Sequence, residues 1–178
     1  MERLETERLI LRRPRYEDAR AIFDRYASDG EVTHYLSWRR HHSIEDAEVF
    51  VSFSESEWTR WGCGPYLAFS RADGMLLGST GLAFETRLVA QTGYVFARDA
   101  WGHGYATESL RAMIDLARAR HVQRLYAICH VDHRASWRVM EKAGMTREGV
   151  IPRHIIFPNL GPAACDVLAY AIALNGAE

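Results

Sequence analysis

The chain has 178 residues, of which 48% are hydrophobic and 25% are charged. This length suits one domain with a sizeable core, and the composition excludes a disordered, collagen-like or coiled-coil protein. The 22 basic and 23 acidic residues give a formal net charge of −1, so the overall charge does not favour nucleic acid as a partner.

Cysteine usage and the N-terminal segment indicate the compartment. Cys63, Cys129 and Cys165 are widely spaced and form no Cys-x-x-Cys pair, which indicates a reducing environment and not a disulfide framework. Residues 1–8 carry both signs of charge, and no stretch has the ~18 apolar residues needed to cross a bilayer. We therefore expect a cytoplasmic protein with no membrane partner.

The first third of the chain predicts one short strand followed by two amphipathic helices. Residues 9–11 are apolar between arginines and read as a strand, and the apolar residues between positions 19 and 26 have helical spacing. Ser43 and Asp46 have the spacing of a capping box, and one apolar helical face continues from there to Trp58.

Beyond residue 65 the pattern changes to that of strands. Residues 66–70, 76–84 and 92–97 predict an antiparallel meander, with a hairpin turn at residues 72–74. A helix over 104–120 and a buried strand over 125–129 then predict a right-handed crossover, which pairs the strand near Val95 in parallel with the strand near Ile128.

A helix over residues 132–143 that ends at Gly144, and a strand pair over 155–157 and 167–174, complete the predicted elements. No internal repeat or linker interrupts them. We expect an α/β (α+β) fold in a single domain that spans residues 1–178.

The most informative segment is the glycine-rich turn Trp101-Gly102-His103-Gly104-Tyr105-Ala106-Thr107, which lies between a strand and a helix. Backbone N–H groups in such a turn point at one anion, and the helix N-terminus adds about half a positive charge. The turn therefore predicts a phosphate site, with an ordinary glycine turn that opens a helix as the structural alternative.

Two nucleotide-binding interpretations of this turn are disfavoured. Thr107 stands where a dinucleotide fingerprint has Gly or Ala, and Arg124 stands where that fingerprint has an acidic residue. Lys142 is the only lysine, so the sequence has no Gly-x-x-x-x-Gly-Lys-Ser/Thr loop.

Three separated segments, residues 4–12, 101–106 and 135–145, resemble the RimJ/RimL-type branch of the GNAT superfamily of N-acetyltransferases. They occur in the family's order, and the middle one resembles its pyrophosphate-binding motif. The resemblance implies a GNAT fold, a mixed central sheet with a splayed parallel strand pair and flanking helices. It also implies acetyl-CoA as cosubstrate and a protein N-terminal or small-molecule amine as acceptor, and it allows for a homodimer.

The resemblance also assigns cofactor contacts. The pantetheine arm would lie in the wedge between the splayed strands, against the backbone of Tyr94, Val95 and Phe96, with a main-chain N–H near Phe96 as oxyanion donor. His133 stands where relatives have an asparagine that holds pantetheine, and a solvent-facing residue at the helix entry is the alternative. The pyrophosphate would contact Gly102, His103, Gly104, Tyr105, Ala106 and Thr107.

The catalytic assignments depend on the same resemblance. Ser136 matches a serine near the sulfur that would protonate the departing thiolate, with a helix serine bonded to backbone as the alternative. The usual position of the general base reads Gln91, which cannot accept a proton, so Glu85 and His130 are the substitutes.

Other interpretations are weaker. A metal site is not expected at Cys129, His130 and His133, because a strand turns the first two to opposite faces and no fourth ligand is evident. Trp38, Trp58 and Trp61 are candidates for the wall of an acceptor pocket, with packing in the core as the favoured role. A non-catalytic acetyl-CoA-binding module is the alternative function.

Overall fold

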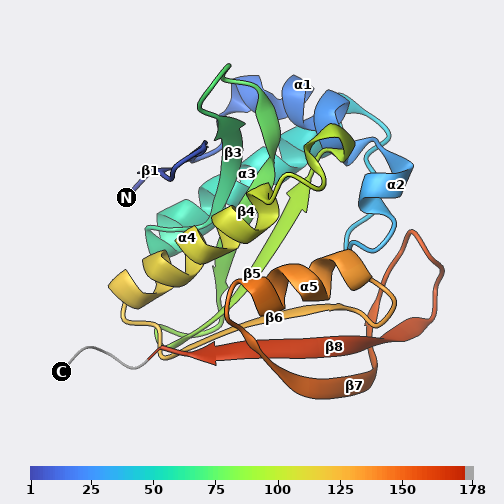
Figure 1. The fold of residues 1–178 in the computed structure, drawn as a ribbon. Helices are drawn as coiled ribbons and strands as arrows, with labels where there is room; N and C mark the ends of the chain where they lie inside the picture. Colours follow the sequence, from blue (N-terminus) through green and yellow to red (C-terminus); the bar gives the residue numbers. More distant parts are fainter. Residues whose placement is uncertain (175–178) are drawn as a thin grey trace.

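The computed structural model describes residues 1–174 and contains an eight-stranded mixed sheet with helices on both faces (Figure 1). The strands follow the order β1-β2-β3-β4-β5-β6-β8-β7, and among these eight described strands only β5 and β6 pair in parallel. Their bounds are β1 Arg3–Glu5, β2 Leu9–Arg12, β3 Pro65–Ser70, β4 Leu76–Phe84, β5 Val89–Phe96, β6 Arg124–His130, β7 Thr146–Ile156 and β8 Ala164–Ala173. The expected α/β class with a mixed sheet is confirmed.

The helices agree with the predicted ones where apolar residues keep helical spacing over a long segment. They are α1 Ala19–Ile22, α2 Gly30–Thr33, α3 Ile44–Trp61, α4 Tyr105–Ala119 and α5 Arg134–Lys142. The capping box of α3 is present at Ser43 and Asp46, and Gly144, with φ of 91°, follows α5. The helix expected over residues 19–26 is instead α1 followed by a π-helical turn, Phe23–Ala27.

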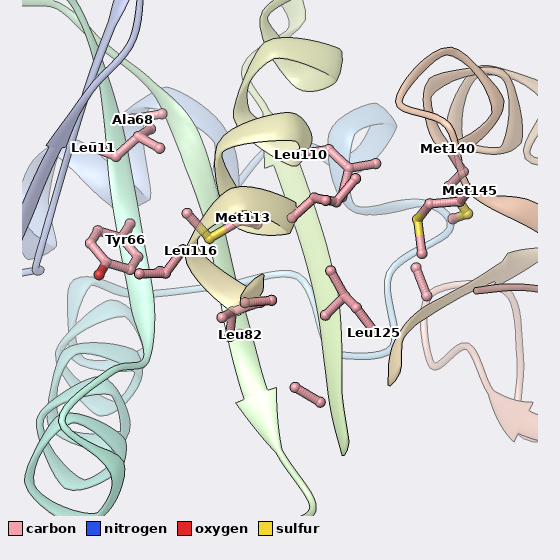
Figure 2. Packing of buried hydrophobic residues seen from close by; sticks show 14 of the residues in the cluster. Leu11, Tyr66, Ala68, Leu82, Leu110, Met113, Leu116, Leu125, Met140 and Met145 are labelled. Atoms are coloured by element: carbon pink, nitrogen blue, oxygen red, sulfur yellow. The ribbon is translucent and has the colours of Figure 1, made fainter. Parts of the chain in front are cut away.

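Side chains of the strands alternate between two apolar clusters, one on each face of the sheet. Tyr66 and Ala68 of β3 belong to the larger cluster beneath α4 and α5, whereas Leu67 belongs to the smaller cluster beneath α1 and α3. Figure 2 shows the larger cluster, where Leu110 and Met113 of α4 lie over the strands. Both are fully buried.

The parallel pairing of β5 and β6 is short. Only three residue pairs are in register, and the last joins Gln91 to Tyr126. Beyond that pair, β5 continues beside β4 to Phe96 and β6 continues beside β8 to His130, so the strands diverge (Figure 1). The expected splay is confirmed, but the pairing lies before the predicted position near Val95 and Ile128, because each strand follows its own antiparallel partner.

Other differences from the predicted elements concern short or irregular strands. β1 and α2 were not predicted, and β7 is much longer than the predicted strand over residues 155–157. Its register shifts twice against β8, which hides the period of two in the sequence. Within residues 1–174 no helix is both long and apolar enough to cross a membrane.

The close approach of β4 to β5 generates a stability prediction. A Cβ at Gly78 would overlap the carbonyl of Val95 and lie 2.8 Å from the Cα of Phe96, whereas a Cβ at Gly93 would meet nothing within 4 Å. Gly78→Ala should therefore lower the free energy of unfolding by about 1–3 kcal/mol, and Gly93→Ala by much less. Urea unfolding of both variants measures this. Equal losses in the two variants would contradict the close packing.

Candidate functional site

One edge of β5 is open where the strands diverge. The N–H of Ala97 donates to the carbonyl of Leu77 on β4 at 2.8 Å, and the backbone groups of successive strand residues point to opposite sides. The main chain of Phe96 and Tyr94 therefore points away from β4, into the divergence. Val95, which is in register with Ser79, turns its main chain toward β4, so it does not offer the backbone contact predicted for it.

On this open edge, the carbonyl of Phe96 already accepts a hydrogen bond. The indole N–H of Trp101 donates to that carbonyl at 2.8 Å. Trp101 thereby fixes the start of the glycine-rich turn to the end of β5. The N–H of Phe96 is the group at this residue that remains directed at the divergence.

The glycine-rich turn leads directly into α4. Gly102 and Gly104 have φ of 78° and 82°, a left-handed conformation that glycine adopts without strain, and Gly104 is the N-cap of the helix. The guanidinium of Arg8 donates to the carbonyl of His103 at 2.9 Å and lies 4.8 Å from the centre of the Tyr105 ring. The turn therefore presents N–H groups of the α4 N-terminus beside an arginine.

Glu108 ties this turn to the N-terminal segment. Its carboxylate accepts hydrogen bonds from the Thr6 hydroxyl at 2.6 Å and the Arg8 N–H at 2.8 Å, and it pairs with the Arg8 guanidinium at 2.7 Å. Burial alone would raise the pKa of Glu108, but these hydrogen bonds lower it overall. Neither Arg8 nor Glu108 was predicted as a site residue from the sequence, although Arg8 lies in the first segment that carries the family resemblance.

Ser136 and Tyr94 meet across the divergence. The Tyr94 hydroxyl donates to the carbonyl of Ser136 at 2.8 Å and lies 3.0 Å from its Oγ, so β5 is linked to α5. Ser136 is buried, and burial raises the pKa of the Tyr94 hydroxyl, which stays protonated at neutral pH. Burial also raises the pKa of the neighbouring Cys129 to about 11, so its thiol is protonated and unreactive.

A cavity of about 670 Å³ adjoins this pair. It extends from α1 and α3 across β4 and β5 to β6 and α5. Of the predicted site residues, it brings together Tyr94, Val95, His133 and Ser136. Phe96, Glu85, His130 and the turn over residues 102–107 do not line it.

Tyr35, which no sequence pattern indicated as a site residue, contacts the two histidines after β6. Its ring stacks on His130 and on His133, with ring centres 5.0 and 4.9 Å apart. His133 lines the cavity, and burial, with smaller contributions from His130 and His34, lowers its pKa to about 4. His133 is therefore a neutral imidazole at physiological pH.

The two substitute bases lie apart from the cavity wall. The Nδ1 of His130 accepts the N–H of Asp132 at 3.2 Å, which leaves Nε2 of the neutral ring as a donor. Glu85 is exposed beyond the end of β4, where β5 and β6 are still paired, and its carboxylate accepts the Tyr126 hydroxyl. Burial and this bond raise the pKa of Tyr126 to about 12.

Two of the three tryptophans take the roles weighed for them, whereas Trp61 does not line the cavity and stacks on Phe84 with ring centres 5.4 Å apart. Trp38 lines the cavity. Trp58 is buried in the larger apolar cluster, where its indole N–H donates to the carbonyl of Pro65 at 2.9 Å. Tyr26 and Glu57 also line the cavity and were not predicted, because helical periodicity alone does not show which turn of a helix faces a hollow.

Comparison with known proteins adds two findings at the level of sequence. Residues 8–146 match the family model described as Acetyltransferase (GNAT) domain. A relative from Bacillus subtilis, named Uncharacterized N-acetyltransferase YoaA, is 33% identical over 162 residues, which cover 85% of this chain and 87% of the relative.

Two solved structures share the fold. RimL, a ribosomal L7/L12 alpha-N-protein acetyltransferase in complex with coenzyme A, has a TM-score of 0.85 at 22% identity, with 97% of this chain and 98% of that chain covered. Spermidine N-acetyltransferase from Vibrio cholerae, in complex with CoA and spermine, has a TM-score of 0.79 at 16% identity, with 95% and 97% covered. The same architecture thus occurs in proteins named for a protein acceptor and for a polyamine acceptor.

The lowered pKa of His133 predicts a pH effect on stability. The unfolded chain binds a proton at this imidazole near pH 6.5, whereas the folded protein binds it only near pH 4, so stability falls as pH drops between these values. His133→Asn should reduce this loss of unfolding free energy by about 1–3 kcal/mol. His154→Asn, which replaces an exposed histidine, should leave the loss unchanged. Urea unfolding at pH 4.5 and pH 7 measures it. A His133→Asn protein with the wild-type pH dependence would show that the imidazole is not buried in neutral form.

Proposed function

The chain belongs to the GNAT acetyltransferase family and is an acetyl-CoA-dependent N-acetyltransferase, and from that premise we propose that it transfers the acetyl group directly from acetyl-CoA to an amine in the cavity. The observation that carries this proposal is the open edge of β5, which adjoins both the glycine-rich turn and the cavity. The acceptor is a small-molecule amine or a protein N-terminal amine.

Acetyl-CoA binds along two sets of main-chain groups. The amides of the pantetheine arm pair with the open edge at Tyr94, as an added strand would, and the thioester carbonyl accepts the N–H of Phe96. The pyrophosphate binds the N–H groups of residues 102–107, where the α4 dipole and the Arg8 guanidinium favour an anion. His133, on the wall of the cavity, contacts the pantetheine as a neutral imidazole.

The N–H of Phe96 stabilises the oxyanion that forms when the amine attacks the thioester carbonyl. This group is fixed by the strand before reaction, so its dipole needs no reorientation as the negative charge develops. One preorganised donor of this kind is worth about 3 kcal/mol of barrier lowering.

Ser136 protonates the departing thiolate. Its Oγ lies 3.0 Å from the Tyr94 hydroxyl, which holds the serine in position, and water in the cavity returns the proton to the serine. A thiol with a pKa of ~8.5 leaves readily at neutral pH, so this contribution to the rate is modest.

The geometry favours neither Glu85 nor His130 as the general base. Glu85 is bonded to Tyr126 outside the cavity, and the free nitrogen of a neutral His130 is a donor. We propose that water in the cavity accepts the proton of the ammonium and carries it to solvent before the amine attacks.

Three further expectations remain part of this proposal. The enzyme works in the cytoplasm as one domain over residues 1–178, and its three free cysteines suit a reducing compartment. It forms a homodimer through β7, an edge strand on which Val150 and Ile156 are exposed. The alternative of a non-catalytic module has no support from the family comparisons.

Gly104→Val tests the phosphate site. The φ of 82° at this position disfavours a β-branched residue, and its Cβ would lie 3.4 Å from the Arg8 guanidinium, so the turn must shift and its N–H groups lose their common direction. We expect acetyl-CoA affinity to fall about 10-fold or more by calorimetric titration.

Gly74→Val is the matched control. Gly74 has a similar φ of 72°, lies in the β3–β4 hairpin turn and has no atom near its Cβ position. This variant should show a comparable backbone strain in thermal unfolding but wild-type affinity. If a folded Gly104→Val protein binds acetyl-CoA with wild-type affinity, the turn is not part of the acetyl-CoA site.

A further inference from the structure

The cavity has a large aromatic and aliphatic wall. One stripe of α3, made by Asp46, Phe50, Phe53 and Glu57, faces it at helical spacing. Other segments of the chain contribute Tyr26, Tyr35, Trp38, Ile155 and Phe157. Such a wall suits an acceptor with an apolar body.

Part of this wall is exposed to solvent. Val49 is 68% exposed and Phe53 is 54% exposed, and both line the cavity from the same side of α3. Large apolar side chains gathered beside a hollow mark a surface that a ligand covers, because their contact with water is unfavourable.

The acidic and basic side chains that line the cavity are not balanced in number. Among the described residues that line the cavity, two are carboxylates and none is Arg or Lys, in a chain with 22 basic residues. His41 and His133 also line it, and burial is the main cause that lowers the pKa of both. The charged side chains that line the cavity are therefore negative at neutral pH.

The two carboxylates differ in what they already bind. Asp46 accepts the N–H groups of His42 and Ser43 at 2.8 and 3.2 Å, which stabilises the start of α3. The carboxylate of Glu57 makes no hydrogen bond or ion pair with any residue in the range 1–174. Glu57 is half-buried at the end of the same stripe and is the charge available to a ligand.

This inference rests on the proposed acetyl transfer and deepens it. We infer that the acceptor is a small primary amine on an aromatic or branched apolar body without a carboxylate, and that Glu57 is the residue that selects its cationic form. The aromatic faces add cation–π attraction for the ammonium as it enters. An acceptor carboxylate would meet no cation in the wall and would be repelled by Glu57 and Asp46.

Amines matched to their amino acids test this inference. Release of free CoA is measured with acetyl-CoA and phenethylamine against phenylalanine, and with tryptamine against tryptophan, since each pair differs by one carboxylate. We expect kcat/KM to be at least ~100-fold higher for the amine of each pair. The amines should also exceed spermidine and a short peptide with a free N-terminus. Equal rates within the pairs, or preference for spermidine or for the peptide, would overturn the inference.

Glu57→Gln tests the assigned residue. It should raise the KM for phenethylamine about 5-fold at low salt, leave kcat unchanged, and lose this effect as the salt concentration rises. Glu55→Gln is the control, because Glu55 lies on α3 but does not line this cavity. A fall in kcat with a flattened acidic limb would make Glu57 the general base, and unchanged kinetics would give it no role; either result overturns the assignment.

Calorimetric titration with acetyl-CoA separates this inference from the function on which it rests. A wild-type protein that does not bind acetyl-CoA contradicts the proposed transfer itself. A protein that binds acetyl-CoA and acetylates amines without the expected preference contradicts only the acceptor class.

Discussion

The short parallel contact between β5 and β6 is the constraint on which the site depends. The two strands share three residue pairs and then follow different antiparallel partners, β4 and β8. Since neighbouring strands of a sheet are twisted relative to one another, strands that stop pairing separate progressively. This separation exposes the main chain of Tyr94 and Phe96 and leaves room for the cavity. The hydrogen bond from Tyr94 to Ser136 spans the gap between β5 and α5.

A second feature, the network around Arg8, holds the glycine-rich turn at the end of the open edge. Arg8 binds the Glu108 carboxylate and the His103 carbonyl, while Trp101 binds the end of β5. Glu108 lies in the first turn of α4, where its charge would oppose an incoming phosphate. Its pairing with Arg8 offsets that charge and leaves the N–H groups of the turn to act on the ligand.

Periodic segments could be predicted from the sequence, and the cavity could not. The α4 and β6 segments have a continuous apolar period, and the glycine-rich turn has a recognisable pattern, so their positions agree with the structure. Glu57 and Tyr35 have no such signal, because their place in the cavity depends on how α3 packs on α1 and β3 and on the path of the segment before α3. The direction of the Val95 backbone likewise follows from its register with Ser79, which side-chain patterns do not encode.

The central claim is that the open edge of β5 binds acetyl-CoA through its main chain, and amide hydrogen exchange measured by NMR tests it most directly. Without ligand, the Phe96 amide should exchange much faster than the Ala97 amide, which is bonded to Leu77. Saturation with acetyl-CoA should slow exchange at Phe96 and leave Ala97 unchanged. If exchange at Phe96 is the same with and without bound acetyl-CoA, the cosubstrate does not use this edge and the account is wrong.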